Sequence, residues 1–127
     1  SLKLILHCNY DYHSTQSNIG RSMKKVISGQ IYDTRTATFI HEDWNGLSPK
    51  DFSYCREQLY RKRTGEFFVH GDGGASTRWR TRHGNAYYDG AGIRPLTNQK
   101  ALQWAENHGM PADEIIEVFD ISEEVSK

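Results

Sequence analysis

The stretch Leu59–Gly74, with the sequence L-Y-R-K-R-T-G-E-F-F-V-H-G-D-G-G, decides how the rest of the chain is expected to fold. Two β-prone runs flank a short turn that ends at Gly65. The second run is apolar and aromatic, as in a half-buried strand, and glycine accepts the positive φ that such a turn requires. The sequence therefore predicts a β-hairpin over 59–70 at the centre of the domain.

A glycine-rich bend follows this hairpin, with glycines at 71, 73 and 74. Glycine clusters end strands and let another group approach the backbone closely. We therefore expect the strand to stop after His70, and either a ligand or another strand to lie against the bend. A phosphate-binding loop is a weaker interpretation, because residues 75–78 offer a poor helix start and no lysine.

Composition limits the chain to one modest domain. Its 127 residues can form one domain with a core of its own. Hydrophobic residues make up 36% and charged residues 25%, and seven tyrosines and five phenylalanines supply much of the apolar area, so the core is expected to be small and aromatic. The formal net charge is zero, which excludes a strongly basic nucleic-acid binder of the histone type.

Charge is distributed unevenly along the chain. Residues 50–94 hold nine Lys or Arg against five Asp or Glu, whereas residues 95–127 hold two against seven. This asymmetry favours pairing of the basic middle with the acidic C-terminal segment, either inside the fold or across a dimer.

The first residues differ from the rest. Residues 1–22 are one short apolar run followed by a polar stretch, and Met23 with two lysines after it resembles a start of translation. We expect 1–22 to be an N-terminal arm or appendage, packed on the sheet or on a neighbouring chain, and 23–127 to be a single domain. No run approaches the ~20 apolar residues of a membrane span and no secretory signal is recognisable, which favours a cytoplasmic location and no membrane partner.

Several short secondary-structure elements are predicted before the central hairpin. Residues 26–32 read as two strands around a Ser-Gly turn, and residues 37–41 as the third strand of a meander. Ser48 and Pro49, with Asp51 soon after them, predict a short helix, because serine caps helices and proline fits the first helical position.

The C-terminal third predicts an edge strand over 93–96 and a helix over 98–108, with a second short helix after Pro111. The apolar face of the first helix consists of Ala101, Leu102, Trp104 and Ala105. We therefore predict an α+β fold: an antiparallel β-sheet of about five or six strands, with one main C-terminal helix packed on one face through Leu102 and Trp104.

Basic and aromatic residues are interleaved in two places. Arg61, Lys62 and Arg63 lie at the turn of the hairpin. Arg78, Arg80 and Arg82 alternate with Trp79, Thr81 and His83, and a strand here would place the three arginines on one face and Trp79 on the other. Cations would contact phosphates and exposed rings would stack on bases. The alternative is that these arginines are solvated or paired with acidic residues of the same protein, in a surface loop.

A further pattern runs through the chain: Tyr32-Asp33-Thr34 with Thr36-Ala37, Leu59-Tyr60-Arg61, Gly65 with Phe67-Phe68, His70-Gly71 with Gly73-Gly74, then Ile93, Pro95-Leu96, Ala101 and Trp104-Ala105-Glu106. This series resembles small proteins predicted in phages, plasmids and other mobile elements. The resemblance covers about 23–119 and implies a setting in mobile DNA and the bacterial cytoplasm. It implies no activity and no site.

Two catalytic arrangements are conceivable from the residue types. His70 and Asp72 lie at the glycine bend, and together with His41 or His83 they are candidate ligands for zinc or a similar ion, as in a metal-dependent hydrolase. Their spacing matches no metal motif, and a strand-end histidine with a turn-capping aspartate explains the same residues. Cys8 and Cys55 are too few for a disulfide framework, and Cys55 lacks the surroundings of a nucleophile, so two buried free thiols are expected.

These observations favour binding over catalysis. We expect a non-enzymatic binding protein without a cofactor or metal, acting through protein–protein contacts with a second copy of itself, as a homodimer, or with a host or mobile-element protein. The alternative is a nucleic-acid-binding accessory protein that uses Arg61, Lys62, Arg63, Arg78, Arg80, Arg82 and Trp79. A metal-dependent hydrolase comes third.

Overall fold

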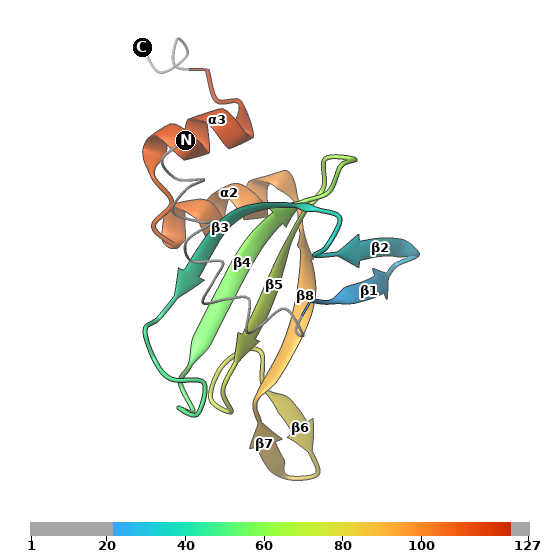
Figure 1. Ribbon diagram of the computed structural model, residues 1–127, viewed down its shortest axis with the longest axis vertical. Helices are drawn as coiled ribbons and strands as arrows, with labels where there is room; N and C mark the ends of the chain where they lie inside the picture. The colour runs from blue at the N-terminus through green and yellow to red at the C-terminus, as the bar shows by residue number, and fades with distance from the viewer. Residues whose placement is uncertain (1–21, 123–127) are drawn as a thin grey trace.

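A computed structural model describes residues 22–122 of the chain (Figure 1). Residues 1–21 of the arm predicted at 1–22 lie outside the described residues. The elements are β1 (Lys24–Ile27), β2 (Gln30–Asp33), β3 (Thr38–Trp44), β4 (Cys55–Arg61), β5 (Phe67–Gly73), β6 (Thr81–His83), β7 (Ala86–Tyr88), β8 (Gly90–Leu96), α2 (Asn98–Asn107) and α3 (Ala112–Phe119). The predicted α+β class with antiparallel pairing is confirmed.

The central hairpin forms as predicted and is longer than expected. Strands β4 and β5 pair over their whole length, from Arg61 opposite Phe67 to Cys55 opposite Gly73. The backbone N–H of Lys62 donates to the carbonyl of Glu66 at 2.7 Å, and Gly65 takes φ +105°. The expectation that the strand stops after His70 is wrong, because the glycines at 71 and 73 continue the ladder.

The four-stranded sheet has the order β3-β4-β5-β8, and all three pairings are antiparallel. The edge strand expected near 93–96 is confirmed as part of β8, with Pro95 opposite Phe68. Within residues 22–122 the remaining strands form two separate two-stranded ribbons, β1-β2 and β6-β7, so the described strands are divided among three sheets and the predicted single sheet of five or six strands is not seen.

Helix α2 packs on one face of the four-stranded sheet (Figure 1). The buried core joins Leu59, Phe67 and Val69 of the sheet to Ala101, Trp104 and Ala105 of α2 and to Met110. Trp104 packs as predicted. Leu102 is only half-buried, and Ala101 and Ala105 are the residues that accompany Trp104 in the core. Burying a large apolar side chain stabilises the fold by about 1.5–3 kcal/mol.

Helix α2 is capped and stopped at the predicted residues, and α3 begins at the predicted place. The Thr97 side chain accepts a hydrogen bond from the backbone N–H of Lys100 and so caps α2, and Gly109 follows its end with φ +78°. Helix α3 begins after Pro111 and places Phe119 against Phe67, with ring centroids 5.0 Å apart. Within 22–122, no helix is long and apolar enough to cross a membrane.

The ribbon β1-β2 turns at the predicted Ser28-Gly29 pair, which takes φ of 52° and 80°. The expected meander is only partly correct, because among the described strands β2 pairs with β1 alone and β3 pairs with β4. The ribbon is held to the sheet by Tyr32, whose ring packs edge-on against Phe68 at 5.5 Å.

The short helix predicted after Ser48 is wrong. The segment 48–54 forms successive turns, in which Asp51 N–H donates to the Ser48 carbonyl and Tyr54 N–H to that of Asp51. The side chain of Asp51 accepts from the backbone N–H of Ser53, two residues on. Aspartate offers the backbone this local partner in turns, and here that interaction replaces the helical pattern.

The glycines at 71, 73 and 74 allow close approach, and the chain itself makes that approach. The indole of Trp79 lies against Gly71 and Gly92, which are cross-strand partners on β5 and β8. The Thr77 side chain lies against Gly73, and the Phe52 backbone lies against Gly74. The segment 74–80, together with the Phe52 backbone, therefore occupies the space beside these glycines, which explains the glycines without a bound ligand.

The contrast between the two glycines under Trp79 gives a test. A Cβ added at Gly71 would overlap the indole, whereas one added at Gly92 would lie 3.5 Å from it, an ordinary contact. We expect Gly71→Ala to lower the free energy of unfolding by about 1–3 kcal/mol and Gly92→Ala to change it little. Urea denaturation of both variants measures this, and equal midpoints would contradict the packing described.

Candidate functional site

The basic residues singled out from the sequence lie in two groups at opposite ends of the four-stranded sheet. Arg61, Lys62 and Arg63 are at the turn between β4 and β5. The loop 74–80 and the ribbon β6-β7 carry the other residues, at the far end of the long axis (Figure 1). The structure therefore does not combine all seven predicted residues into one surface.

At the hairpin turn, two of the three cations contact the protein's own aromatic rings. The guanidinium of Arg61 lies 5.0 Å from the centroid of Phe67, and the ammonium of Lys62 lies 4.5 Å from that of Tyr32. Arg61 also donates to the carbonyl of Val118 at 3.4 Å, at the end of α3. These contacts connect the hairpin to its surroundings.

The second group lies on a projecting ribbon. Strands β6 and β7 pair from Thr81 opposite Tyr88 to His83 opposite Ala86, and every residue from 81 to 89 is exposed. Gly84, with φ +62°, closes the turn. The alternation predicted from Arg78 onward is wrong up to 80, because the chain there forms turns and strand geometry begins only at Thr81.

Pairing across the ribbon gives it two chemically different faces. Arg82 and Tyr87 are opposite each other and share one face. The guanidinium of Arg80 lies 4.0 Å from the Tyr87 centroid and that of Arg82 lies 5.9 Å from it. The other face carries His83 and Tyr88, whose rings meet edge-to-face at 5.5 Å. One face is therefore cationic and the other is aromatic.

The base of the ribbon is anchored to a buried carboxylate. Trp79 donates its indole N–H to Glu57 Oε2 at 2.8 Å, and Arg78 Nε lies 3.9 Å from the same oxygen. Glu57 is only 3% exposed. Arg94 places its guanidinium 5.8 Å from the Trp79 ring, and burial together with the Arg78 charge lowers the pKa of Arg94. Trp79 and Arg78 thus serve the fold, which leaves Arg80 and Arg82 as the cations of the ribbon.

The second oxygen of Glu57 joins the same carboxylate to α2. Trp104 donates its indole N–H to Glu57 Oε1 at 2.7 Å, and His108 Nε2 lies 3.7 Å from that oxygen. The other ring nitrogen of His108 lies 2.6 Å from Asp43 Oδ2 on β3. One buried carboxylate therefore fixes the glycine-bend loop and the main helix to the same strand, β4.

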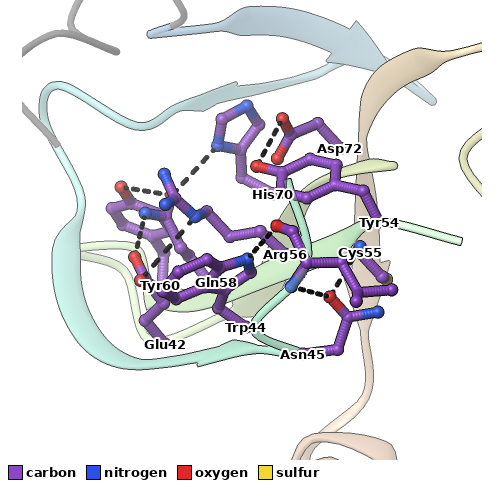
Figure 2. Close-up of polar contacts among 11 residues, drawn as sticks. Glu42, Trp44, Asn45, Tyr54, Cys55, Arg56, Gln58, Tyr60, His70 and Asp72 are labelled. Carbon is purple, nitrogen blue, oxygen red and sulfur yellow. Dashed lines mark hydrogen bonds and ion pairs between the residues drawn. The ribbon is translucent and has the colours of Figure 1, made fainter. Parts of the chain in front are cut away.

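The face of the sheet opposite α2 carries a polar cluster (Figure 2). Gln58 donates to Glu42 Oε1 at 2.8 Å, and its carbonyl oxygen lies 3.2 Å from His70 Nδ1. Arg56 Nε lies 3.7 Å from Glu42 Oε2. Tyr60 stacks on Phe68 at 5.3 Å, and burial, with the Glu42 charge, raises the pKa of Tyr60 to about 12. These contacts connect β3, β4 and β5 across this face of the sheet.

One open cavity of about 350 Å³ lies beside this cluster. Its lining includes Tyr54, Asp72 and Asp89. The Tyr54 hydroxyl donates to Asp72 Oδ2 at 3.3 Å, so these two polar groups hold each other at its wall.

The candidate metal ligands are not brought together. His41 faces α2, with its ring 6.0 Å from that of Trp104, whereas His70 and Asp72 lie on the opposite face of the sheet and His83 lies on the ribbon. Among residues 22–122, no group of three or more His, Cys, Asp or Glu is arranged to hold a metal ion. Cys55 is a free, half-buried thiol, and its pKa is raised by burial and then by Glu57, which opposes thiolate formation. Cys8 lies outside the described residues.

Comparison with known proteins adds no assignment: no family model, no curated protein and no solved structure matches this chain.

Sequence reasoning missed two features of this region. The ribbon has a recognisable signal, since Gly84-Asn85 between β-prone residues is typical of a two-residue hairpin turn. The role of Glu57 has none, because only the folded chain brings Trp79 and Trp104 to a carboxylate located 22 and 47 residues earlier.

The Glu57 contacts predict a large loss of stability on a small chemical change. In Glu57→Gln one oxygen becomes an NH2 group and faces an indole N–H, so one buried donor loses its acceptor. We expect the free energy of unfolding to fall by roughly 1–3 kcal/mol, measured by urea denaturation. Glu66→Gln, at an exposed turn position, is the matched control and should change little. An unaltered midpoint for Glu57→Gln would refute the anchoring role.

Proposed function

We propose that this protein is a non-enzymatic binding protein and that it contacts nucleic acid through the β6-β7 ribbon. The single observation that supports this most is the arrangement of Arg80, Tyr87 and Arg82 on one face of a ribbon whose residues are all exposed. Guanidinium groups held against an aromatic ring are pre-ordered, and arginine recognises phosphate through a fixed fork of donors.

The β6-β7 ribbon can contact a partner because its side chains are not part of the buried core. The buried core consists of side chains of the four-stranded sheet and of α2, together with Met110. Within 22–122, β6 and β7 pair only with each other. A two-stranded ribbon is also one of the elements that proteins place against nucleic acid.

The buried titratable groups of the sheet also favour a binding role over a catalytic one. Glu57 is only 3% exposed and accepts hydrogen bonds from two indole donors. His70 is held beside Gln58. Groups arranged in this way stabilise a scaffold, whereas a catalytic acid or base needs access to a substrate.

A protein partner, including a second copy of the chain, is the second candidate function. Strands β3 and β8 are the two edges of the four-stranded sheet in the part of the chain described here, and an open edge can accept another strand. The resemblance to proteins of phages and plasmids supports a setting in the bacterial cytoplasm, where the partner is a mobile-element or host protein. Both candidates use the same scaffold through different surfaces.

Nucleic-acid binding is tested with labelled oligonucleotides and fluorescence anisotropy over a range of salt concentrations. We expect binding that weakens with salt, and Arg80→Ala/Arg82→Ala should lower affinity and make the log–log salt slope shallower by about 1–2, because about two phosphate contacts are lost. The control, Lys25→Ala/Arg63→Ala, removes the same charge at exposed positions outside the β6-β7 ribbon. If the control weakens binding as much as the ribbon variant does, the ribbon is not the contact surface.

Self-association is tested by light scattering at rising protein concentration, at low and at high salt. Strand pairing between edges predicts a dimer that persists at high salt, because backbone hydrogen bonds and apolar contacts are not screened. A dimer that dissociates in salt would indicate charge pairing between copies instead. A monomer at every concentration contradicts self-association, and a protein partner would then have to be a different chain.

A further inference from the structure

The aromatic face of the ribbon specifies the partner further. Tyr88 is 51% exposed, and its ring meets that of His83 in a T-shaped arrangement with the centroids 5.5 Å apart. Tyr87, on the other face, is 43% exposed and has a guanidinium 4.0 Å from its centroid. Tyr88 is therefore the ring of the ribbon that offers an uncharged aromatic surface to a flat ligand.

Resting on the proposed function, we propose that the ribbon binds single-stranded nucleic acid, with phosphates on Arg80 and Arg82 and an unpaired base stacked on Tyr88. A two-stranded ribbon is narrow, so one flexible strand can contact both of its faces. Stacking on aromatic rings combined with cationic contacts to the backbone is how proteins hold single strands without reading their sequence.

The two obvious alternatives each leave part of the ribbon unused. In a duplex the bases stack on one another and present only their edges in the grooves, so a base is not available to cover Tyr88. An acidic protein segment would pair with Arg80 and Arg82, but its carboxylates offer no stacking group to Tyr88. The arrangement of both groups on one ribbon favours an unpaired strand.

The test compares a labelled oligothymidylate, which does not pair with itself, with a hairpin duplex of equal charge, and adds polyglutamate as a competitor. We expect the single strand to bind more tightly than the duplex, and polyglutamate to compete poorly. Tyr88→Leu keeps an apolar side chain and removes the ring, so it should weaken single-strand binding about fivefold or more, whereas Tyr88→Trp should retain it.

Each outcome decides between explanations. If the duplex binds as tightly as the single strand, or Tyr88→Leu binds like the unaltered protein, the stacking inference is wrong and nucleic-acid binding still stands. If polyglutamate competes as well as the oligonucleotide, the partner is an acidic protein. If neither nucleic acid binds, both proposals fail. Because Tyr88 lies outside the core, an unchanged melting temperature for both variants will show that the fold is intact.

Discussion

The structure depends on one buried negative charge and on the donors that compensate it. Glu57 lies in the middle of β4, and both of its oxygens accept indole N–H groups, one from the loop after β5 and one from α2. A carboxylate removed from water is costly unless it is fully hydrogen-bonded, so these two tryptophans are constrained to their positions. Through them a single strand fixes both the main helix and the base of the ribbon, which lie far apart in sequence.

Much of the scaffold could be predicted because its signals are local. The turn at Gly65 and the Thr97 cap depend on residues within a few positions of one another, and both form as expected. The sequence predictions are wrong where two local signals compete, or where contacts between residues distant in sequence determine the structure. At Asp51 the same side chain that favours a helix start also bonds to the amide of Ser53, and the turn prevails.

The candidate site was predicted less completely than the fold. Charge and aromatic content singled out Arg80 and Arg82, which the structure leaves exposed, but could not divide the basic residues into those that contact the fold and those that do not. Arg61 and Trp79 contact side chains or backbone groups distant in sequence, Val118 and Glu57 respectively. Only the pairing of β6 with β7 reveals that alternate side chains of the ribbon form two faces.

The independence of the ribbon from the core has a consequence for how such a chain can diverge. Residues 81–89 can change in size and charge without leaving a cavity or an uncompensated polar group in the interior. Substitutions at exposed positions of this kind usually alter the free energy of unfolding by less than about 0.5 kcal/mol. Related chains can therefore exchange one recognition preference for another through changes in this segment, while inheriting the four-stranded framework unaltered.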